Sequence, residues 1–404
     1  MRQRPTLAFI LVTVFLDVLG IGLMIPVLPG LIGTMTQSPD QQAYWYGALA
    51  ASYGVMQFFL TPLLGALSDQ YGRRPVLLLS IFGLGFSYVV MALTHSLPLL
   101  LLARMVSGAT GASFSVANAY VADITPAEKR GKSFGAVGAA FGLGFIVGPV
   151  LGGLLGAQDM RLPFWVAAGL SLTNWLYGFF VLPESLPGAN RTRVTAARAN
   201  PFGAFSHLAR LRGVGSLIVV FAFTMLAQSM LQSTWVLYTQ FRFGWGPKDN
   251  GFALFVVGLT AVIAQGLLLG RLLKRFGEVR LAIIGMSIAT PVYLAYGLAT
   301  AAWLMYALIV TNLLSFTVVP ALQSLISRAA SAGDQGLTQG SLNAISSIMM
   351  VIAPLLGTAL LARVGHLPHT DWRIGITFFL CSAIQLLALI VAIKHFRHVP
   401  AQAA

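Results

Sequence analysis

Charged residues are scarce in this 404-residue chain, at 9% of the sequence, whereas hydrophobic residues make up 57%. A soluble domain carries about 25% charged residues, so this chain has too little polar surface for a water-soluble fold. Its long apolar runs also lack the polar positions that mark amphipathic elements. Each run is close to the ~20 residues that cross a bilayer as a helix. The sequence therefore predicts a polytopic membrane protein.

Cysteine is nearly absent, with Cys381 alone in the last apolar run. A single cysteine excludes an internal disulfide and offers no metal cluster. Because no membrane-embedded Ser/His/Asp grouping or phosphate loop occurs either, we expect neither an enzyme nor a cofactor. The net charge of +14 could indicate a nucleic-acid partner. The basic residues, however, lie in short loops between apolar runs and not on one face of a domain, which argues against nucleic acid.

Six apolar runs lie on each side of a polar segment that contains Pro and Arg. The runs span residues 7–30, 44–67, 75–95, 97–121, 134–157, 163–182, 214–239, 249–270, 281–299, 301–327, 337–362 and 373–393. We therefore predict a six-helix bundle over 1–182, a cytoplasmic linker over 183–212 and a second six-helix bundle over 213–404. Arg2 and Arg4 precede the first run without a small-residue cleavage site, so we expect a retained helix and no signal peptide.

The basic residues predict the orientation. Most Lys and Arg residues fall in alternate loops and in the central linker. The opposite loops hold only Arg161, Arg242, Lys248, Arg363 and Arg373. Because cytoplasmic loops are enriched in Lys and Arg, both termini are expected in the cytoplasm.

A loop motif repeats between the two halves. The sequence from Gly65 to Arg74 reads GALSDQYGRR, and Gly270 and Gly277 frame a similar loop 205 positions later. Such parallel repeats place a substrate cavity at their interface near the bilayer midplane. Gly65 permits close helix packing and Gly72 a tight turn. Arg73 and Arg74 can pair with Asp69 or with Asp123. We expect a conformational latch here, the alternative being a simple orientation anchor.

A second motif lies in the fifth run, where Gly144, Gly148, Pro149, Gly152 and Gly153 follow the pattern G-x3-G-P-x2-G-G. Glycines at this spacing let another helix approach closely, and the proline bends its own helix. The loop motif resembles a signature of the major facilitator superfamily, and the glycine string resembles that of its antiporters. The resemblance implies an all-α fold of twelve transmembrane helices in two six-helix bundles around a central cavity. It also favours export over uptake.

The similarity extends to one family of antiporters. The segments LDVLGIG from Leu16, RMVSGATGA from Arg104 and TWVLY from Thr234 resemble TetA-type tetracycline/proton antiporters. This resemblance implies a proton-coupled exporter of small amphiphilic drugs or metabolites in a bacterial inner membrane, with tetracyclines among the candidate substrates. The internal repeat makes a monomer sufficient. Ser87, Ala261 and Ala289 stand where those transporters carry an acid, a histidine and an acid. These differences argue against a metal-chelated tetracycline and against that family's proton relay.

Only one of the eleven acidic residues, Asp17, falls deep inside an apolar run. It lies roughly 16 Å from the inner end of its helix, and Arg104 lies at a similar depth in the fourth helix, roughly 10 Å from the outer end. A buried charge costs several kcal/mol unless it is paired. A static salt bridge between the two is one interpretation. We expect instead that Asp17 carries the proton, its neutral form being favoured by desolvation and its charged form by the approach of Arg104.

Polar and aromatic side chains within the apolar runs are candidate substrate contacts, although interhelical hydrogen bonding is an equal alternative for each. The candidates are Tyr53, Gln57, Asn118, Gln228, Gln232, Trp235, Asn312, Phe316, Gln323 and Asn343. Together they favour an amphiphilic ligand bound by amide and aromatic contacts. The main alternative function is a proton-coupled uptake carrier or facilitator for a sugar or metabolite. A receptor or scaffold that transports nothing would need neither the repeat nor the buried acid.

Overall fold

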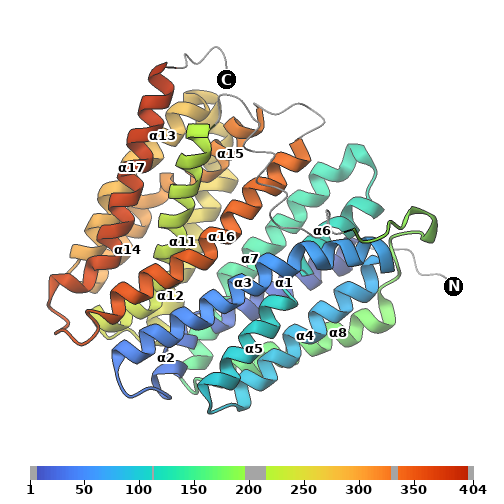
Figure 1. Ribbon diagram of the computed structural model, residues 1–404, viewed down its shortest axis with the longest axis horizontal. Helices are drawn as coiled ribbons and strands as arrows, with labels where there is room; N and C mark the ends of the chain where they lie inside the picture. Colours follow the sequence, from blue (N-terminus) through green and yellow to red (C-terminus); the bar gives the residue numbers. More distant parts are fainter. Residues whose placement is uncertain (1–6, 112, 196–214, 329–334, 399–404) are drawn as a thin grey trace. The chain divides into compact units, whose positions relative to one another are not determined.

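The computed structural model describes residues 7–111, 113–195, 215–328 and 335–398, and every regular element in these ranges is helical (Figure 1). The first half contains α1 (Leu7–Met24), α2 (Leu28–Gly33), α3 (Pro39–Tyr71), α4 (Arg73–Leu93), α5 (Leu97–Ala109), α6 (Ser113–Ile124), α7 (Arg130–Gly156) and α8 (Leu162–Val181). The second half contains α11 (Gly215–Phe243), α12 (Pro247–Val262), α13 (Leu269–Leu298), α14 (Ala302–Thr311), α15 (Val318–Arg328), α16 (Gln335–Ala362) and α17 (Ile376–His398).

Two segments of the second half are helical but irregular. A π-helical stretch, Ile263–Leu268, joins α12 to α13, and a 3₁₀ stretch, Asn312–Thr317, joins α14 to α15. The continuous helix Pro247–Leu298 is 52 residues long, more than twice the ~20 residues needed to cross the hydrocarbon core. Gly277 (φ 71°, ψ 168°) interrupts it with non-helical geometry. Eleven helices in the described ranges are long and apolar enough to cross a membrane. Because the helix Pro247–Leu298 is long enough for two crossings, the eleven helices are consistent with the predicted twelve crossings.

Helix boundaries differ from the predicted runs where proline or glycine intervenes. The first run, predicted as 7–30, ends as α1 at Met24 and resumes as α2 after a turn that contains Pro26. The fourth run is divided between α5 and α6 at a Thr-Gly pair, Thr110 and Gly111. Helix α3 continues to Tyr71, beyond the predicted end at 67, because hydropathy marks the hydrocarbon length and not the end of the helix.

The chain divides into two compact units. Unit 1 comprises Met1–Gln37, Ala48–Pro201 and Gly246–Phe255, and unit 2 comprises Ser38–Gly47, Phe202–Trp245 and Val256–Ala404. The first turns of α3 thus belong to unit 2, whereas the rest of α3 belongs to unit 1. The first turns of α12 belong to unit 1, whereas the rest of α12 belongs to unit 2. Of the linker predicted for 183–212, residues 196–212 lie outside the described ranges.

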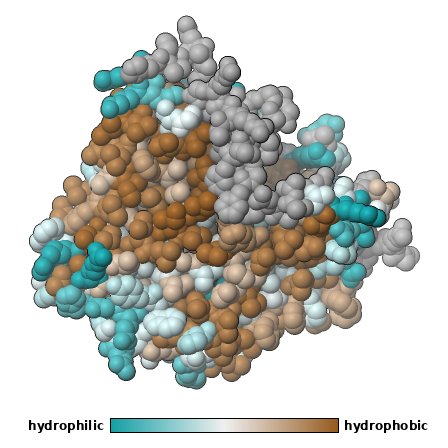
Figure 2. All heavy atoms as spheres, in the orientation of Figure 1, coloured by the Kyte–Doolittle hydropathy of each residue, from teal (hydrophilic) through white to brown (hydrophobic). Residues whose placement is uncertain are grey.

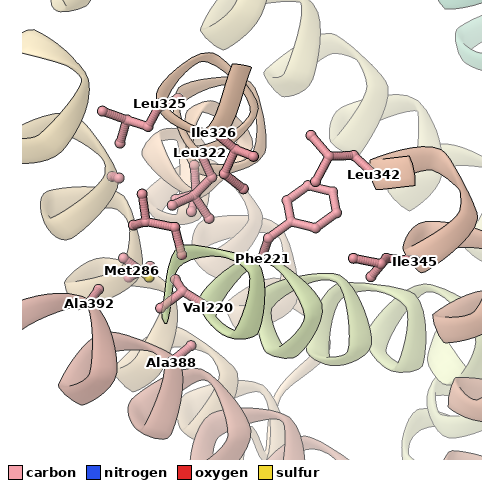
Figure 3. Packing of buried hydrophobic residues seen from close by; sticks show 14 residues of the cluster. Val220, Phe221, Met286, Leu322, Leu325, Ile326, Leu342, Ile345, Ala388 and Ala392 are labelled. Carbon is pink, nitrogen blue, oxygen red and sulfur yellow. The ribbon is translucent and has the colours of Figure 1, made fainter. Parts of the chain in front are cut away.

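Each unit has its own apolar core. In unit 1 this core includes Ile10 and Val14 of α1, Leu77 and Ile81 of α4, and Val116 of α6. In unit 2, residues from five helices meet, as Figure 3 shows: Val220 and Phe221 from α11, Met286 from α13, Leu322, Leu325 and Ile326 from α15, Leu342 and Ile345 from α16, and Ala388 and Ala392 from α17.

Large apolar side chains also cover the outside of the helices. Phe180 is 72% exposed and Trp303 68% exposed. On the face drawn in Figure 2, hydrophobic residues cover the helices and hydrophilic residues gather toward their ends. Since monomeric soluble proteins rarely expose large contiguous apolar patches, this surface is that of a multi-pass membrane protein.

Candidate functional site

The predicted proton carrier, Asp17, lies inside unit 1. It is 4% exposed, and its Oδ1 atom is buried without a hydrogen-bond partner. The hydroxyl of Ser113, at the start of α6, is the hydrogen-bonding group beside the carboxyl. Ser113 follows no motif and was not predicted from the sequence. Asp17 is thus a buried acid within a membrane-spanning helix, with one hydroxyl as its hydrogen-bonding neighbour.

Arg104, the predicted partner of Asp17, is 7% exposed in the same unit. Its guanidinium carbon lies 4.4 Å from the centre of the Tyr53 ring, and its Nη1 atom lies 3.3 Å from Sδ of Met24. Among the described residues no ion pair joins it to Asp17. The static salt bridge is therefore absent from this conformation, and an aromatic face takes the place of the carboxylate.

Tyr88 of α4 completes the surroundings of the acid. It is 1% exposed and lies close enough to Asp17, Arg104 and Tyr53 to interact electrostatically with all three. Gly20, one turn after Asp17, leaves room for it: a Cβ atom there would lie 3.3 Å from the Tyr88 hydroxyl. The cluster of Asp17, Tyr53, Tyr88, Arg104 and Ser113 thus draws on five helices, and we call it the acid cluster.

A neighbouring pair of hydroxyls occupies the position at which an acid was expected by resemblance. The Oγ atoms of Ser87 on α4 and Ser107 on α5 lie 2.7 Å apart, and both residues are buried. Ser87 therefore joins two helices of unit 1 by a neutral hydrogen bond. This position cannot carry charge in this chain.

The glycine motif of α7 lies directly against α1. A Cβ atom on Gly148 would lie 2.8 Å from the Cα atom of Gly22, and one on Gly144 would lie 2.8 Å from the carbonyl oxygen of Phe15. Gly152 meets the backbone of Leu23 in the same way. The two backbones therefore touch over three turns, starting beside Asp17.

The other side of α7 packs against the first turns of α12, also in unit 1. A Cβ atom on Gly153 would lie 2.6 Å from the carbonyl oxygen of Pro247 and 3.0 Å from the Cα atom of Gly251. Gly251 in turn lies against the carbonyl of Pro149. The five motif positions thus serve two interfaces of one helix.

The loop motif forms an ionic network. Arg73 lies 2.6 Å from Asp69 and 3.1 Å from Asp123, and it donates a hydrogen bond of 2.6 Å to Ser68. Arg74 makes no ion pair among the described residues and donates instead to the carbonyl of Phe179. Gly72 has φ 108°, a value that favours glycine. Gly65 has open space around it, so close packing, its predicted role, is not what this position provides.

Glu184, which the sequence analysis did not single out, extends this network. Its carboxylate accepts hydrogen bonds from the backbone N–H groups of Arg73 (2.8 Å) and Arg74 (3.2 Å) at the start of α4, and from Ser185 and Leu186. A carboxylate at a helix N-terminus is favoured by the exposed N–H groups and the helix dipole. Ser185 also donates to Asp123. The segment after α8 is therefore tied to the loop motif.

The predicted substrate contacts divide by burial. Gln57 and Asn118 in unit 1, and Gln228, Phe316 and Gln323 in unit 2, are partly exposed, and Gln232 and Asn343 of unit 2 are exposed. Trp235 is only 2% exposed and packs edge-on against Tyr296 and Phe378. The remaining two are Asn312, 6% exposed, and Tyr53, beneath Arg104.

Two of these residues lie in the irregular part of unit 2. Asn312 and Phe316 belong to the 3₁₀ stretch, and the Gln265 side chain of the π-helical stretch donates a hydrogen bond of 3.2 Å to the carbonyl of Phe316. The buried Oδ1 atom of Asn312 has no hydrogen-bond partner. Irregular turns within long helices often mark functional positions.

Gln385 of α17 is a buried amide that sequence reasoning missed. It is 1% exposed, and neither polar atom of its side chain has a partner. Its neighbours one turn away on the same face, Cys381 and Ala388, are apolar and fully buried. A glutamine within an apolar run was the only signal.

Comparisons with known proteins place the chain in a family. Residues 10–354 match the model of the Major Facilitator Superfamily. The chain belongs to the Major Facilitator Superfamily. It is 39% identical to the class C tetracycline resistance protein of Escherichia coli over 389 residues, 96% of each chain, and 36% identical to the class D protein of Salmonella ordonez over 95% of this chain and 97% of that one.

A solved structure agrees with this membership. The crystal structure of the human organic anion transporter MFSD10 (TETRAN) superposes with a TM-score of 0.71 at 25% identity, covering 96% of this chain and 98% of that one. The expected fold of two helical bundles and the family resemblance are thus confirmed. The chain is a transporter of this superfamily.

Proposed function

We propose that this protein is a proton-coupled exporter that exchanges small amphiphilic drugs for protons across a bacterial inner membrane. The observation that carries the proposal is the acid cluster, in which a membrane acid makes no ion pair with any described residue and a buried arginine lies on a neighbouring tyrosine ring. Family membership supports transport, and the similarity to tetracycline resistance proteins over nearly the whole chain supports export.

The chemistry required of the acid cluster is the gain and loss of one proton. An ionised carboxylate buried without a partner costs several kcal/mol, so Asp17 as found here is suited to hold a proton. When Arg104 or water reaches the carboxyl, the charged form becomes favourable and the proton leaves. Drug and proton would then compete for one state of the protein, which is what exchange requires.

The glycine motif supplies a means of moving between states. Because backbone touches backbone from Phe15 to Leu23, motion of α7 displaces α1 and with it Asp17. On its other side α7 contacts the first turn of α12 at Gly153. We infer that α7 transmits the change at Asp17 to α12.

Partly exposed amides and aromatic groups are the proposed drug contacts: Gln57, Asn118, Gln228, Gln232, Phe316, Gln323 and Asn343. Uncharged groups of this kind suit an amphiphilic ligand. Tetracyclines are the first compounds to test because relatives confer resistance to them. The distribution of Lys and Arg supports cytoplasmic termini.

Accumulation of a fluorescent drug in energised cells tests the proposal. Cells that express the wild-type protein should accumulate less drug than control cells, and cells that express Asp17→Asn at equal membrane abundance should not. Tetracycline should be measured with and without added magnesium. Accumulation that is the same in all three strains for every drug tested contradicts export, and accumulation that rises with the wild-type protein supports the alternative, an uptake carrier.

A further inference from the structure

We propose that Tyr53 is a positioning residue for Arg104: its ring holds the guanidinium while Asp17 carries a proton, and Arg104 leaves the ring for the Asp17 carboxylate when that proton is lost. This inference rests on the proposed proton coupling and deepens it. It gives Tyr53 a role other than contact with the drug.

The first support is the geometry at Arg104. The guanidinium lies 4.4 Å above the Tyr53 ring, within the ~6 Å at which a cation is attracted to an aromatic face. Such contacts are strongest where water is excluded, and Arg104 is only 7% exposed. The Tyr53 ring therefore binds the Arg104 guanidinium by a cation–π contact.

The second support is the position of Tyr53 relative to the acid. Tyr53 and Tyr88 each lie close enough to interact electrostatically with both Asp17 and Arg104, so acid and base share one neighbourhood. Asp17 Oδ1 has no hydrogen-bond partner and no ion pair joins the two residues within the described ranges. Movement of the long Arg104 side chain would therefore exchange the aromatic face for the carboxylate.

The backbone fixes Tyr53 in this place. Gly108, one turn after Arg104 on α5, packs against α3 so closely that a Cβ atom would lie 3.0 Å from the Cβ atom of Met56 and would overlap the carbonyl of Tyr53. The Tyr53 hydroxyl lies beside Gly111. The backbone and the hydroxyl of Tyr53 thus both pack against α5 and the turn after it, whereas arginine has one of the side chains with the greatest rotamer freedom.

Among the described residues, the helices around α1 bring no charged group other than Arg104 to Asp17. α3, α4, α5 and α6 contribute Tyr53, Tyr88, Arg104 and Ser113. α7 presents the uncharged glycines of its motif to α1. α8 presents Asn174, whose side chain accepts a hydrogen bond from Thr13. Tyr177 of α8 stacks on Phe9, roughly two turns from Asp17. Arg104 is therefore the cation available to the carboxylate.

The proton step is simple. The O–H bond of Asp17 breaks, the proton passes to water, and the carboxylate takes Arg104 from the Tyr53 ring. Protonation reverses this exchange. The ring therefore competes with the carboxylate for Arg104, and its removal should favour the charged form of Asp17.

The test compares Tyr53→Phe with Tyr53→Leu in proteoliposomes, measuring drug exchange driven by a pH gradient across a series of pH values. Tyr53→Phe keeps the aromatic face and should keep the wild-type pH profile. Tyr53→Leu removes it and should move the midpoint of that profile by about one pH unit to lower pH, since a desolvated cation–π contact is comparable to the free energy of one pH unit. Tyr53→Met, also without a π face, replaces Leu if that variant does not accumulate in the membrane.

Two results would overturn the inference. One is a weaker drug affinity in both Phe and Leu variants with an unchanged pH profile, which makes Tyr53 a drug contact. The other is no change in either variant. In an Arg104→Gln background, Tyr53→Leu should no longer move the profile. If Asp17→Asn abolishes proton-driven exchange while the Tyr53 variants behave alike, the inference fails and the proposed function stands.

Discussion

Arg73 makes polar contacts with Asp69, Asp123 and Ser68 through one guanidinium. Arginine presents several donors in a fixed plane, whereas lysine presents one compact charge. Arg73→Lys should therefore keep the charge and lose the network. We expect it to lower the free energy of unfolding in detergent by about 1–2 kcal/mol, as hydrogen bonds to partly exposed charged groups are lost.

Arg328→Lys is the matched control for this variant. Among the described residues Arg328 pairs with Glu278, at 2.9 Å, and its side chain is 59% exposed. Exposed pairs contribute at most about 1 kcal/mol, so thermal unfolding should change little. Equal destabilisation by the two substitutions would show that the Arg73 contacts do not act as a network.

Residue types were easier to predict than residue partners. A lone acid in an apolar run is conspicuous, and Asp17 was found for that reason. The sequence also pointed to Arg104 and named Tyr53 as a candidate drug contact, but it did not pair the two, because tyrosines are common in membrane helices and spacing does not show which cation lies on a ring. Glu184 was missed because an acid after a helix looks like an ordinary loop residue until the α4 N-terminus is seen beside it.

Among the helices, α7 lies with its backbone in direct contact with α1 at Gly148. A methyl group on Gly148 would meet the backbone of Gly22 at 2.8 Å, and backbone cannot move aside as a side chain can. Gly148→Ala should therefore push α7 from α1, cost about 1–3 kcal/mol of stability and reduce turnover more than drug binding. Thermal unfolding and exchange rates of the purified protein would measure both effects.

The same helix offers a control in Gly138. A Cβ atom there meets nothing within 4 Å, and alanine is a better helix former than glycine by about 1 kcal/mol. Gly138→Ala should leave exchange unchanged and raise stability slightly. Loss of exchange in both variants would mean that α7 must bend freely, and that contact with α1 is not the reason for its glycines.

Helix positions followed from hydropathy, but helix interruptions did not. Apolar runs reveal what lies in hydrocarbon, and they located the crossings to within several residues. The π-helical stretch at Ile263–Leu268 and the 3₁₀ stretch at Asn312–Thr317 depend on packing between distant segments, such as the bond from Gln265 to Phe316. The helix propensity of the residues in one segment cannot predict a contact with a distant segment.

For the molecule as a whole, the two halves repeat in detail. Gly72 and Gly277 both have positive φ, 108° and 71°, and stand 205 positions apart. In unit 1, Gly251 lies against the carbonyl of Pro149, and in unit 2, Gly47 lies against Thr358 and the carbonyl of Pro354. The loop glycines of this repeat were predicted from the sequence. The contacts of the first turns of α3 and α12 with the proline-containing helices α16 and α7 were not predicted from the sequence, because they join residues far apart in the chain.

The orientation of the molecule can be tested with single cysteines. The native Cys381 is fully buried, so it should label slowly with a membrane-impermeant maleimide. Ala189 and Thr370 are exposed. In intact spheroplasts, Thr370→Cys should label rapidly and Ala189→Cys only after lysis, as the distribution of basic residues predicts. The reverse pattern would place both termini outside.

We propose that one proton site, Asp17, couples drug export to the proton gradient. Its most direct test is drug transport by purified protein in proteoliposomes, measured with an imposed pH gradient and again with a drug gradient alone. Asp17→Asn should abolish transport driven by the pH gradient while retaining drug exchange down its own gradient. An Asp17→Asn protein that still concentrates drug in response to a pH gradient would contradict the account.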